Sequence, residues 1–273
     1  MTEPAPADQP VESELHGSVL ILRLNRPASH NAFNLAMMRA FGAALTRAAE
    51  DDEVSVVVLA ARGASFSAGV DLKAYAAAMA SADGPGEINA AAVAGASAAQ
   101  PGLGVLIREQ YAKPVICAVQ GPALGVGCEL VLASDIVVAS EQATFGLPEV
   151  RYGLSPSGGA AARLVKRVAW PRAMWMLLSG EAVDATAASG LGLVTRLAER
   201  GQNPAEVALA MASVIAGHSQ LAVRATKALA TRSAGLFDQD VQRLSDDVMN
   251  RMSESADATG RVQAFFDGRN APR

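Results

Sequence analysis

Two glutamates in the sequence lie in settings that suit acid–base chemistry. Glu129 closely follows a glycine-rich turn at 125–127 (GVG), and Glu149 ends the segment 145–149 (FGLPE) twenty residues later. The residues around Glu149 are apolar, so its carboxylate could lie in the wall of a pocket. Two carboxylates that share a site of low dielectric constant acquire different pKa values, so that one serves as a general acid and the other as a general base. The pair therefore predicts proton transfer without a metal or a protein nucleophile.

Two predicted helix starts could supply backbone N–H groups to the same reaction. One helix begins near Val126 and another near Asp71, each after a strand and a glycine-containing turn. The first N–H groups of a helix have no partner within it and lie at its positive dipole end, where they can stabilise an oxyanion. One such donor typically contributes about 3 kcal/mol to a transition state. Taken alone, each segment is more simply an ordinary helix start with an acid in its first turn. Together with the glutamates, they favour chemistry at a polarised thioester carbonyl.

The composition is that of a globular protein with a large core. The 273 residues are 51% hydrophobic and 18% charged. The net charge of −4 gives no basic footprint for nucleic acid, so a polyanionic ligand must be bound locally. Residues 1–10 are acidic and proline-rich, unlike a signal or transit peptide, and no apolar run reaches membrane-spanning length. We therefore expect a cytoplasmic protein with no nucleic-acid or membrane partner. Cys117 and Cys128 could form a disulfide, but the pattern favours buried free thiols.

Short strands and helices alternate along the chain, and helices follow at its end. Strands are predicted at 15–25, 54–60, 115–119, 136–139 and 193–194, and helices at 35–50, from about 71, at 101–111, at 126–133, from 156 continuously through 171–179, and from 184 to 190 or 192. Further helices are predicted at 204–217, 219–233, 237–252 and 254–267, and a mobile loop with a loose helical part at 81–104. We expect a disordered tail at 1–12, an α/β core with the active site at 13–200, and a helical C-terminal lobe at 201–273.

Other classes of site have less support in the sequence. No HExxH, CxxC or GxSxG motif occurs, which argues against a zinc protease and a serine hydrolase of the nucleophile-elbow type. The segment 125–130 lacks the third glycine of a dinucleotide-binding fingerprint, and no acid follows at the required place. His16, His30 and His218 are scattered and lie near no motif, so we expect no metal site. Trp170 is more simply explained by packing or subunit contact than by cofactor binding.

In combination, these motifs resemble the enoyl-CoA hydratase/isomerase (crotonase) superfamily over about residues 15–270. The resemblance is carried by 24–27 (LNRP), 31–33 (NAF), 66–73 (FSAGVDLK), 113–130 (KPVICAVQGPALGVGCEL), 133–136 (ASDI), 145–149 (FGLPE), 156–159 (PSGG) and 179–196. It implies an α/β fold of the crotonase (ClpP-like) type, a spiral of ββα units with a C-terminal helical lobe. In this family that lobe builds a trimer, and trimers commonly pair into hexamers.

The resemblance also implies roles for individual residues. The backbone N–H groups of Val70 and Val126 would hold the thioester oxygen. Glu129 would orient and deprotonate water, and Glu149 would supply a proton to the α-carbon, although one water could provide both hydroxide and proton. The residues expected to contact coenzyme A, which is part of the substrate rather than a separate cofactor, are Arg26, Ala68, Asp71, Leu72, Lys73 and Phe265. Arg26 and Lys73 could equally be solvated.

The implied reaction is hydration of a trans-2-enoyl-CoA to a 3-hydroxyacyl-CoA, as in fatty acid metabolism. Double-bond isomerisation, acyl-CoA hydrolysis, or binding of acyl-CoA with little turnover are the alternatives. The sequence departs from the family pattern at Val126 and Ser157, where glycine is common, and at Gly268, where a basic residue is usual. The segment 74–112 is also longer than in short-chain hydratases. These departures concern substrate length and affinity for coenzyme A more than the reaction class.

Overall fold

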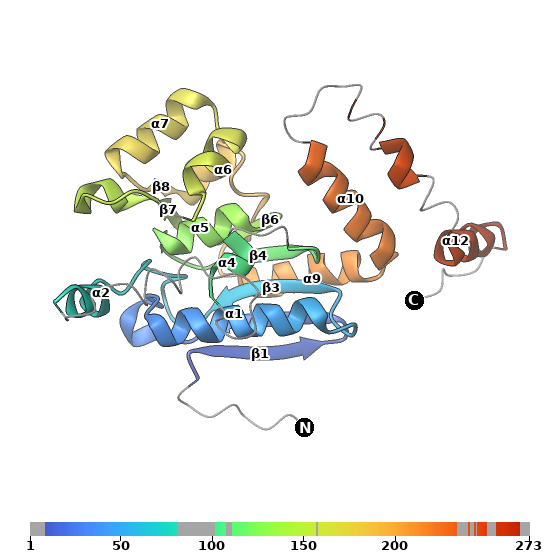
Figure 1. The fold of residues 1–273 in the computed structure, drawn as a ribbon, viewed down its shortest axis with the longest axis horizontal. Coiled ribbons are helices and arrows are strands. Elements are labelled where there is room, and N and C mark those ends of the chain that lie inside the picture. Colours follow the sequence, from blue (N-terminus) through green and yellow to red (C-terminus); the bar gives the residue numbers. More distant parts are fainter. Residues whose placement is uncertain are drawn as a thin grey trace.

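A six-stranded sheet forms the centre of the molecule, as the computed structural model shows (Figure 1). The structure describes residues 9–80, 102–107, 111–156, 158–233, 240, 243, 245–249 and 255–267. The strands of the sheet, in spatial order, are β1 (Val11–His16), β2 (Val19–Leu24), β3 (Val56–Ala61), β4 (Val115–Val119), β6 (Ile136–Ala139) and β9 (Arg196–Leu197). Only the β1–β2 pair is antiparallel, and the other neighbours in the sheet run parallel.

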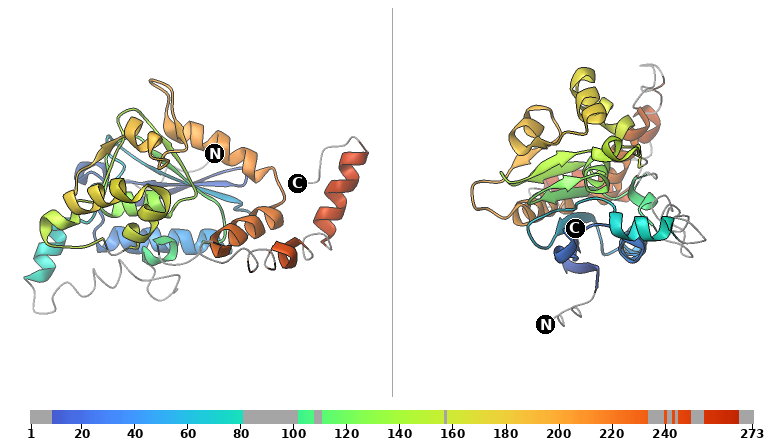
Figure 2. Two further views of the ribbon diagram at one scale, coloured as in Figure 1. Left: turned by 90° about the horizontal axis from the view of Figure 1, so that it is seen from above. Right: turned by 90° about the vertical axis from the view of Figure 1, so that its left-hand side faces the viewer.

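Both faces of this sheet are buried, which explains why its strands read as continuous apolar runs. Successive side chains of β3 point to opposite faces, so Val56 and Val58 belong to one core cluster and Val57 and Leu59 to the other. Helix α9 (Pro204–Ala216) covers the first face, and α1 (Leu35–Glu50) packs on the second (Figure 2).

A second, three-stranded sheet lies above the central one and carries the segments that will matter for the site. It consists of β5 (Ala123–Leu124), β7 (Thr144–Gly146) and β8 (Val183–Asp184). The other described elements between β2 and β9 are η1 (Pro27–Ser29), α2 (Leu72–Met79), α4 (Gly104–Ile107), α5 (Val126–Ala133), the 3₁₀ helix η2 (Pro148–Tyr152), α6 (Ala160–Arg167), α7 (Trp170–Ser179) and α8 (Ala185–Gly190). The α/β class predicted from the sequence is confirmed.

The C-terminal part of the chain is helical. Helix α10 (Gln220–Ser233) lies beside the central sheet, and α12 (Ala256–Phe266) lies farther out on the same side (Figure 1). The Asp257 carboxylate of α12 accepts hydrogen bonds from Ser219, just before α10, and from Arg261. Among the described helices none is long and apolar enough by itself to cross a membrane, although α9 and α10 together, bent by 106° at their junction, would meet the length and composition required.

Several predicted elements are confirmed with their bounds, including α1, β4, α5 and β6. Local signals are strong in these segments: Asn34 caps α1 by accepting from the N–H of Met37 at 2.9 Å, for example. Cys117 and Cys128 are both buried free thiols, as expected. The predicted loop at 81–104 and helix at 237–252 fall largely outside the described residues.

Two predicted strands are wrong in detail. The strand expected at 15–25 is a hairpin of β1 and β2, because Gly17 at φ +60° turns the chain between them. Its first strand begins at Val11, within the segment 1–12 that was expected to be a disordered tail. The strand expected at 193–194 lies at 196–197 instead, and Leu193 and Val194 are buried core residues that precede it.

The helix predicted from 156 through 179 is also wrong, because it is two helices. Helix α6 ends at Arg167, Val168 is extended at φ −122° and ψ 140°, and α7 starts at Trp170. Pro171 explains the break. In a continuous helix it would remove one hydrogen bond, and its ring would clash with the carbonyl of Arg167 four residues earlier. In the first turn of α7 neither cost arises, because the N–H groups there have no helical partner.

Candidate active site

Two loops that are distant in sequence are bonded side by side at the start of the site. The N–H of Ser67 donates to the carbonyl of Pro122 at 3.0 Å, and the N–H of Leu124 donates back to the carbonyl of Ser67 at 2.9 Å. Beyond this bridge the chains come closer still. A methyl group on Gly69 would lie 3.0 Å from the Leu124 carbonyl oxygen, and Gly69 and Gly125 both have positive φ angles, +97° and +53°. Glycine is needed at this crossing both for the backbone angle and for the space.

The crossing places two backbone N–H groups at one cavity. Val126 is the first residue of α5, after the N-cap Gly125. Val70 precedes Asp71, whose carboxylate caps α2 by accepting from the N–H of Ala74 at 3.2 Å. Within the described part of the chain neither the Val70 N–H nor the Val126 N–H donates to a protein acceptor. Both valines line the same cavity, as the predicted pairing of the two helix starts requires.

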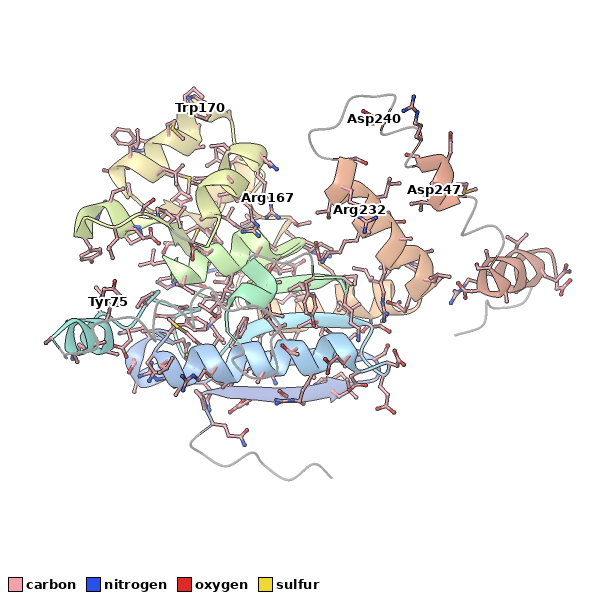
Figure 3. The ribbon with its side chains drawn as sticks, in the orientation of Figure 1. Tyr75, Arg167, Trp170, Arg232, Asp240 and Asp247 are labelled. Atoms are coloured by element: carbon pink, nitrogen blue, oxygen red, sulfur yellow. The ribbon has the colours of Figure 1, made fainter. Side chains whose placement is uncertain are left out.

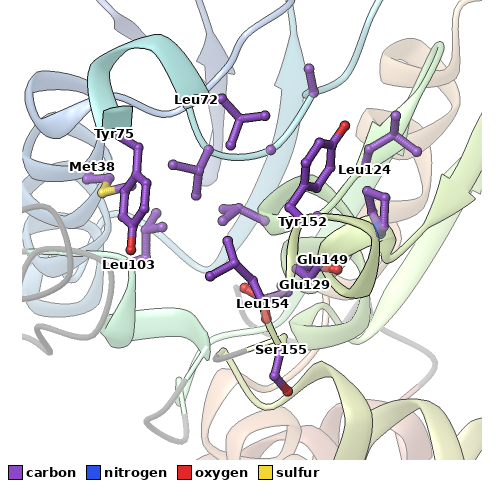
Figure 4. A pocket seen from close by; sticks show the side chains of 16 residues that line it. Met38, Leu72, Tyr75, Leu103, Leu124, Glu129, Glu149, Tyr152, Leu154 and Ser155 are labelled. Carbon is purple, nitrogen blue, oxygen red and sulfur yellow. The ribbon is translucent and has the colours of Figure 1, made fainter. Parts of the chain in front are cut away.

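This first cavity has a volume of about 300 Å³ and also contains both predicted acids (Figure 4). Figure 4 shows Glu129 and Glu149 close together, with side chains of α2 on the opposite side. The wall is mostly apolar and is built by Met38, Leu72, Tyr75, Leu103, Leu124, Pro148, Tyr152 and Leu154. A site of this kind excludes water from most of its surface and strengthens the electrostatic interactions inside it.

Glu129 is held at the inner end of the site. It lies in the first turn of α5 and is only 3% exposed. Its Oε1 accepts a hydrogen bond from the N–H of Gly158 at 2.7 Å, a donor that comes from the loop before α6. The bond fixes the orientation of the carboxylate and leaves its acceptor character intact, which suits a group that receives a proton from a water molecule.

Glu149 has a different environment although it lies nearby. It belongs to η2, and its Oε2 is buried without a hydrogen-bond partner among the described residues. Burial raises the pKa of this carboxyl to about 7, and the negative charge of Glu129 raises it further within that total. At neutral pH a substantial fraction of Glu149 therefore holds a proton, which suits a general acid.

The residues expected to contact coenzyme A are placed differently from one another. Ala68 and Leu72 line the cavity. Arg26 forms an ion pair with Asp71 at 3.2 Å and donates to the Ala32 carbonyl, so its guanidinium is held against the protein. Burial tends to raise the pKa of Asp71, but the hydrogen bond from the Ala74 N–H and the ion pair with Arg26 outweigh it, so the pKa is lowered.

The other two residues expected to contact coenzyme A lie at the surface or beyond description. Lys73 is exposed at the start of α2. Phe265 falls within α12, and its side chain lies outside what the structure describes. Contact with coenzyme A remains a prediction for the whole set. Among the described residues, no group of three or more His, Cys, Asp or Glu side chains is placed so that it could hold a metal ion.

Sequence reasoning missed several residues of the cavity. Tyr75 could have been found, because it is three residues after Leu72 and shares its face of α2. Tyr152, at the end of η2, and the N–H of Gly158, in the irregular segment before α6, carried no comparable signal in the sequence. The apolar neighbours of Glu149 in the sequence have two different locations. Leu154 lines the cavity, whereas Phe145 and Leu147 are buried in the core.

Comparison with known proteins gives a consistent result. The family model for enoyl-CoA hydratase/isomerase matches residues 14–272. The chain is 36% identical to 2,3-dehydroadipyl-CoA hydratase of Escherichia coli over 92% of this chain and 93% of that protein, and 32% identical to enoyl-CoA hydratase EchA19 of Mycobacterium tuberculosis over 94% and 93%. A crystal structure of enoyl-CoA hydratase from M. tuberculosis H37Rv superposes with a TM-score of 0.83 at 34% identity, covering 97% of this chain and 98% of that one. An enoyl-CoA hydratase from Polaromonas gives 0.84 at 30% identity, covering 96% and 98%.

Proposed function

Because the chain belongs to the enoyl-CoA hydratase/isomerase family, we propose that it adds water to the 2,3 double bond of trans-2-enoyl-CoA thioesters and forms 3-hydroxyacyl-CoA. One observation carries the proposal: the carboxylates of Glu129 and Glu149 line the same cavity as Val70 and Val126, whose N–H groups have no described acceptor. Water addition needs a base for the water, an acid for the α-carbon and donors for the thioester oxygen, and this cavity offers one set of each.

The reaction proceeds through an enolate. The thioester oxygen accepts from the N–H groups of Val70 and Val126, which draws electrons away from the double bond. Glu129 takes a proton from water as the water oxygen bonds to C3, and the electron pair of the double bond moves onto the thioester as an enolate. Glu149 then gives its proton to C2. The site returns to its starting state when Glu129 loses a proton to solvent and Glu149 regains one.

The environments of the two acids support this division of roles. Glu149 lacks a donor at Oε2 and has a raised pKa, so it enters the reaction with its proton. Glu129 is oriented by the Gly158 N–H and lies beside the helix start that carries the Val126 N–H. General acid–base catalysis of this kind typically accelerates a reaction by about 10²–10⁴-fold.

The cavity wall favours an uncharged acyl chain. No lysine, arginine or histidine is among the described residues that line it, and the sequence from 74 to 107 contains none. A terminal carboxylate on the acyl chain would enter without a counter-ion and would lose its hydration. The relative named 2,3-dehydroadipyl-CoA hydratase is named for a substrate with such a carboxylate. We infer that this chain prefers neutral aliphatic enoyl groups, with coenzyme A as part of the substrate and no other cofactor.

The C-terminal helices and the family resemblance favour a homotrimer, or a hexamer formed from two trimers. Helix α12 lies away from the central sheet (Figure 2), where it could pack against a second copy of the chain. Sedimentation velocity of the purified full-length chain tests this part of the proposal, and a monomer at micromolar concentration would contradict it.

The reaction itself can be tested by following the enoyl-thioester absorbance of trans-2-butenoyl-CoA and longer homologues in buffer alone. A hydratase removes this absorbance and yields the 3-hydroxy product. An isomerase would instead create the absorbance from a 3-enoyl-CoA, and a hydrolase would release the free thiol of coenzyme A. Tight binding of acyl-CoA with none of these signals would identify a binding protein and overturn the proposed activity.

A further inference from the structure

A second cavity, of about 450 Å³, lies between α5, α6 and α10 and shares no lining residue with the first. Leu106, Tyr111 and Leu132 form apolar parts of its wall. Its charged side chains are Asp135, Arg163, Lys166, Arg167, Arg224, Lys227 and Arg232. In Figure 3, Arg167 at the end of α6 and Arg232 near the end of α10 mark two sides of this cavity. Six cations thus face one carboxylate in a chain whose net charge is −4.

The fold itself accounts for some of these charges. Lys227 Nζ pairs with Asp135 Oδ2 at 2.7 Å and also donates to the Lys113 carbonyl at 2.9 Å. Arg167 Nη2 donates to the Ser134 carbonyl at the end of α5 at 2.7 Å, where a cation complements the helix dipole. Asp135 Oδ2 also accepts from a backbone N–H of β4. The single carboxylate of the cavity is therefore already engaged.

Three of the remaining cations, Arg224, Lys166 and Arg232, have no ion-pair partner among the described residues. The Nε of Arg224 is buried and donates to no acceptor among the described residues. Lys166 and Arg232 line the cavity and form no described ion pair. Burial lowers the pKa of the Arg163 and Arg167 guanidinium groups, although the negative charge of Glu129 opposes the shift at Arg163 and that of Asp135 opposes it at Arg167. Like charges gathered in a partly buried space destabilise a fold unless an anion compensates them.

We propose that this second cavity binds a small anion that carries a diphosphate group, with Arg224, Arg232 and Lys166 as its main contacts. Guanidinium groups offer paired N–H donors that match phosphate oxygens, and an ammonium group adds a mobile point charge. The cavity is larger than a single phosphate needs, and its apolar wall would accept an organic group attached to the diphosphate. The ligand could be free diphosphate or a diphosphate ester, because both carry the same group for the cations to bind.

Isothermal titration of the full chain with inorganic pyrophosphate, at constant ionic strength in chloride buffer, tests the proposal. We expect saturable binding with one site per chain. Arg224→Gln and Arg232→Gln should each weaken it by about tenfold or more. Arg172→Gln removes an exposed arginine of α7 outside the cavity and should change the affinity by less than about twofold. Equal effects of the three substitutions, or heat that follows ionic strength alone, would overturn the proposal.

A second measurement distinguishes a small anion from an acidic segment of another copy of the chain. If a second copy fills the cavity, pyrophosphate will not bind to the assembled protein, and Arg224→Gln with Arg232→Gln will change the sedimentation coefficient. That outcome overturns the proposal. If the proposal holds, the double variant keeps the sedimentation coefficient and the circular dichroism of the parent chain and loses pyrophosphate binding. An ester such as ADP in a parallel titration would then show whether the apolar wall adds affinity.

Discussion

The two ends of helix α5 face cavities of opposite chemistry. At the N-terminal end, Val126 and Glu129 line a mostly apolar cavity that contains two carboxyl groups. At the C-terminal end, Leu132 and Ala133 line a cavity that contains six basic side chains. A helix carries roughly half a positive charge at its N-terminus and half a negative charge at its C-terminus, so one rule accounts for the proposed oxyanion site at one end and the cations at the other.

The comparison also shows where that rule ends. Half a negative charge at the end of α5 explains a bond such as that of Arg167 to the Ser134 carbonyl, but not a whole group of cations. In the same way, the dipole explains an acid in the first turn of α5, but not a second carboxyl group whose pKa is raised to about 7. In each cavity, the charged groups that the helix dipole does not explain are the ones that suggest a ligand.

One residue, Gly158, connects the two regions. The N–H of Gly158 donates to Glu129 at 2.7 Å, and the carbonyl of Gly158 accepts from Arg163 Nη1 at 2.8 Å. Arg163 lines the second cavity and Glu129 the first.

Removing either carboxylate of the first cavity should have the largest effect. Glu129→Gln and Glu149→Gln keep the shape of the side chain but cannot transfer the proton, so each should lower kcat by more than about 10²-fold while leaving the affinity for a saturated acyl-CoA within a few fold. Steady-state kinetics and titration with butyryl-CoA measure the two quantities. Glu141→Gln, an exposed residue before β7, is the control. A near-normal rate in either active-site variant would contradict the two-acid mechanism.

Disturbing the crossing of the two loops should have the next largest effect. Gly69→Ala places a methyl group 3.0 Å from the Leu124 carbonyl oxygen at φ +97°, so it should push the two N–H-bearing loops apart and lower kcat/KM by about 10- to 100-fold. Gly201→Ala is the matched control, because its φ is +81° and nothing lies within 4 Å of the added methyl. Equal activity in the two variants would contradict a role for the close approach of the two loops at Gly69.

A negative charge at the end of the acyl chain should lower kcat/KM by about tenfold or more. We expect kcat/KM for trans-2-hexenoyl-CoA to exceed that for the six-carbon enoyl-CoA with a terminal carboxylate, because the apolar wall has no cation to pair with it. Tyr75→Arg places a cation on α2 at this wall and should narrow or reverse the preference. The inhibition constants of hexanoyl-CoA and adipyl-CoA measure the same preference without turnover, so a failure here is distinguishable from absence of hydratase activity.

The pH dependence of the rate should report the proton on Glu149. Because the pKa of this carboxyl is raised to about 7, the fraction that can donate falls as the pH rises through 7, and kcat/KM should fall by up to about tenfold per pH unit above it. A pH series of initial rates at low substrate concentration gives the profile. A rate that is constant from pH 6 to pH 9 would show that Glu149 does not enter the reaction protonated.

The smallest effect concerns stability. The native state keeps a proton on Glu149 that the unfolded chain loses near the ordinary pKa of 4.5, so stability falls as the pH rises from about 4.5 to about 7. The variant Glu149→Gln has no ionisable group at this position, so its stability should not fall with pH for this reason. It should be as stable as the parent chain below pH 4.5 and more stable by on the order of 1 kcal/mol above pH 7, after allowance for solvent screening. Urea unfolding at several pH values measures the difference, and a constant difference would contradict burial as its cause.

Local patterns in the sequence were enough for much of the fold. The apolar run at 115–119 and the glycine turn before Val126 determined β4 and α5, because each is specified by neighbours along the chain. The hairpin at Gly17 and the break before Pro171 were missed although both residues are visible in the sequence. In these two places a strong apolar pattern on either side outweighed a single residue that turns or interrupts the chain.

For the site, the sequence by itself determined which groups are present: two acids, two helix starts and the glycines that let the loops approach. Only the tertiary structure decided that these groups share one cavity, that the Gly158 N–H holds Glu129, and that Tyr152 completes the wall. The cationic cavity is a stronger case, because its arginines come from α6 and α10 and form no motif. Side chains from distant segments come into contact only when the chain packs, and periodicity or spacing along the sequence does not predict such contacts.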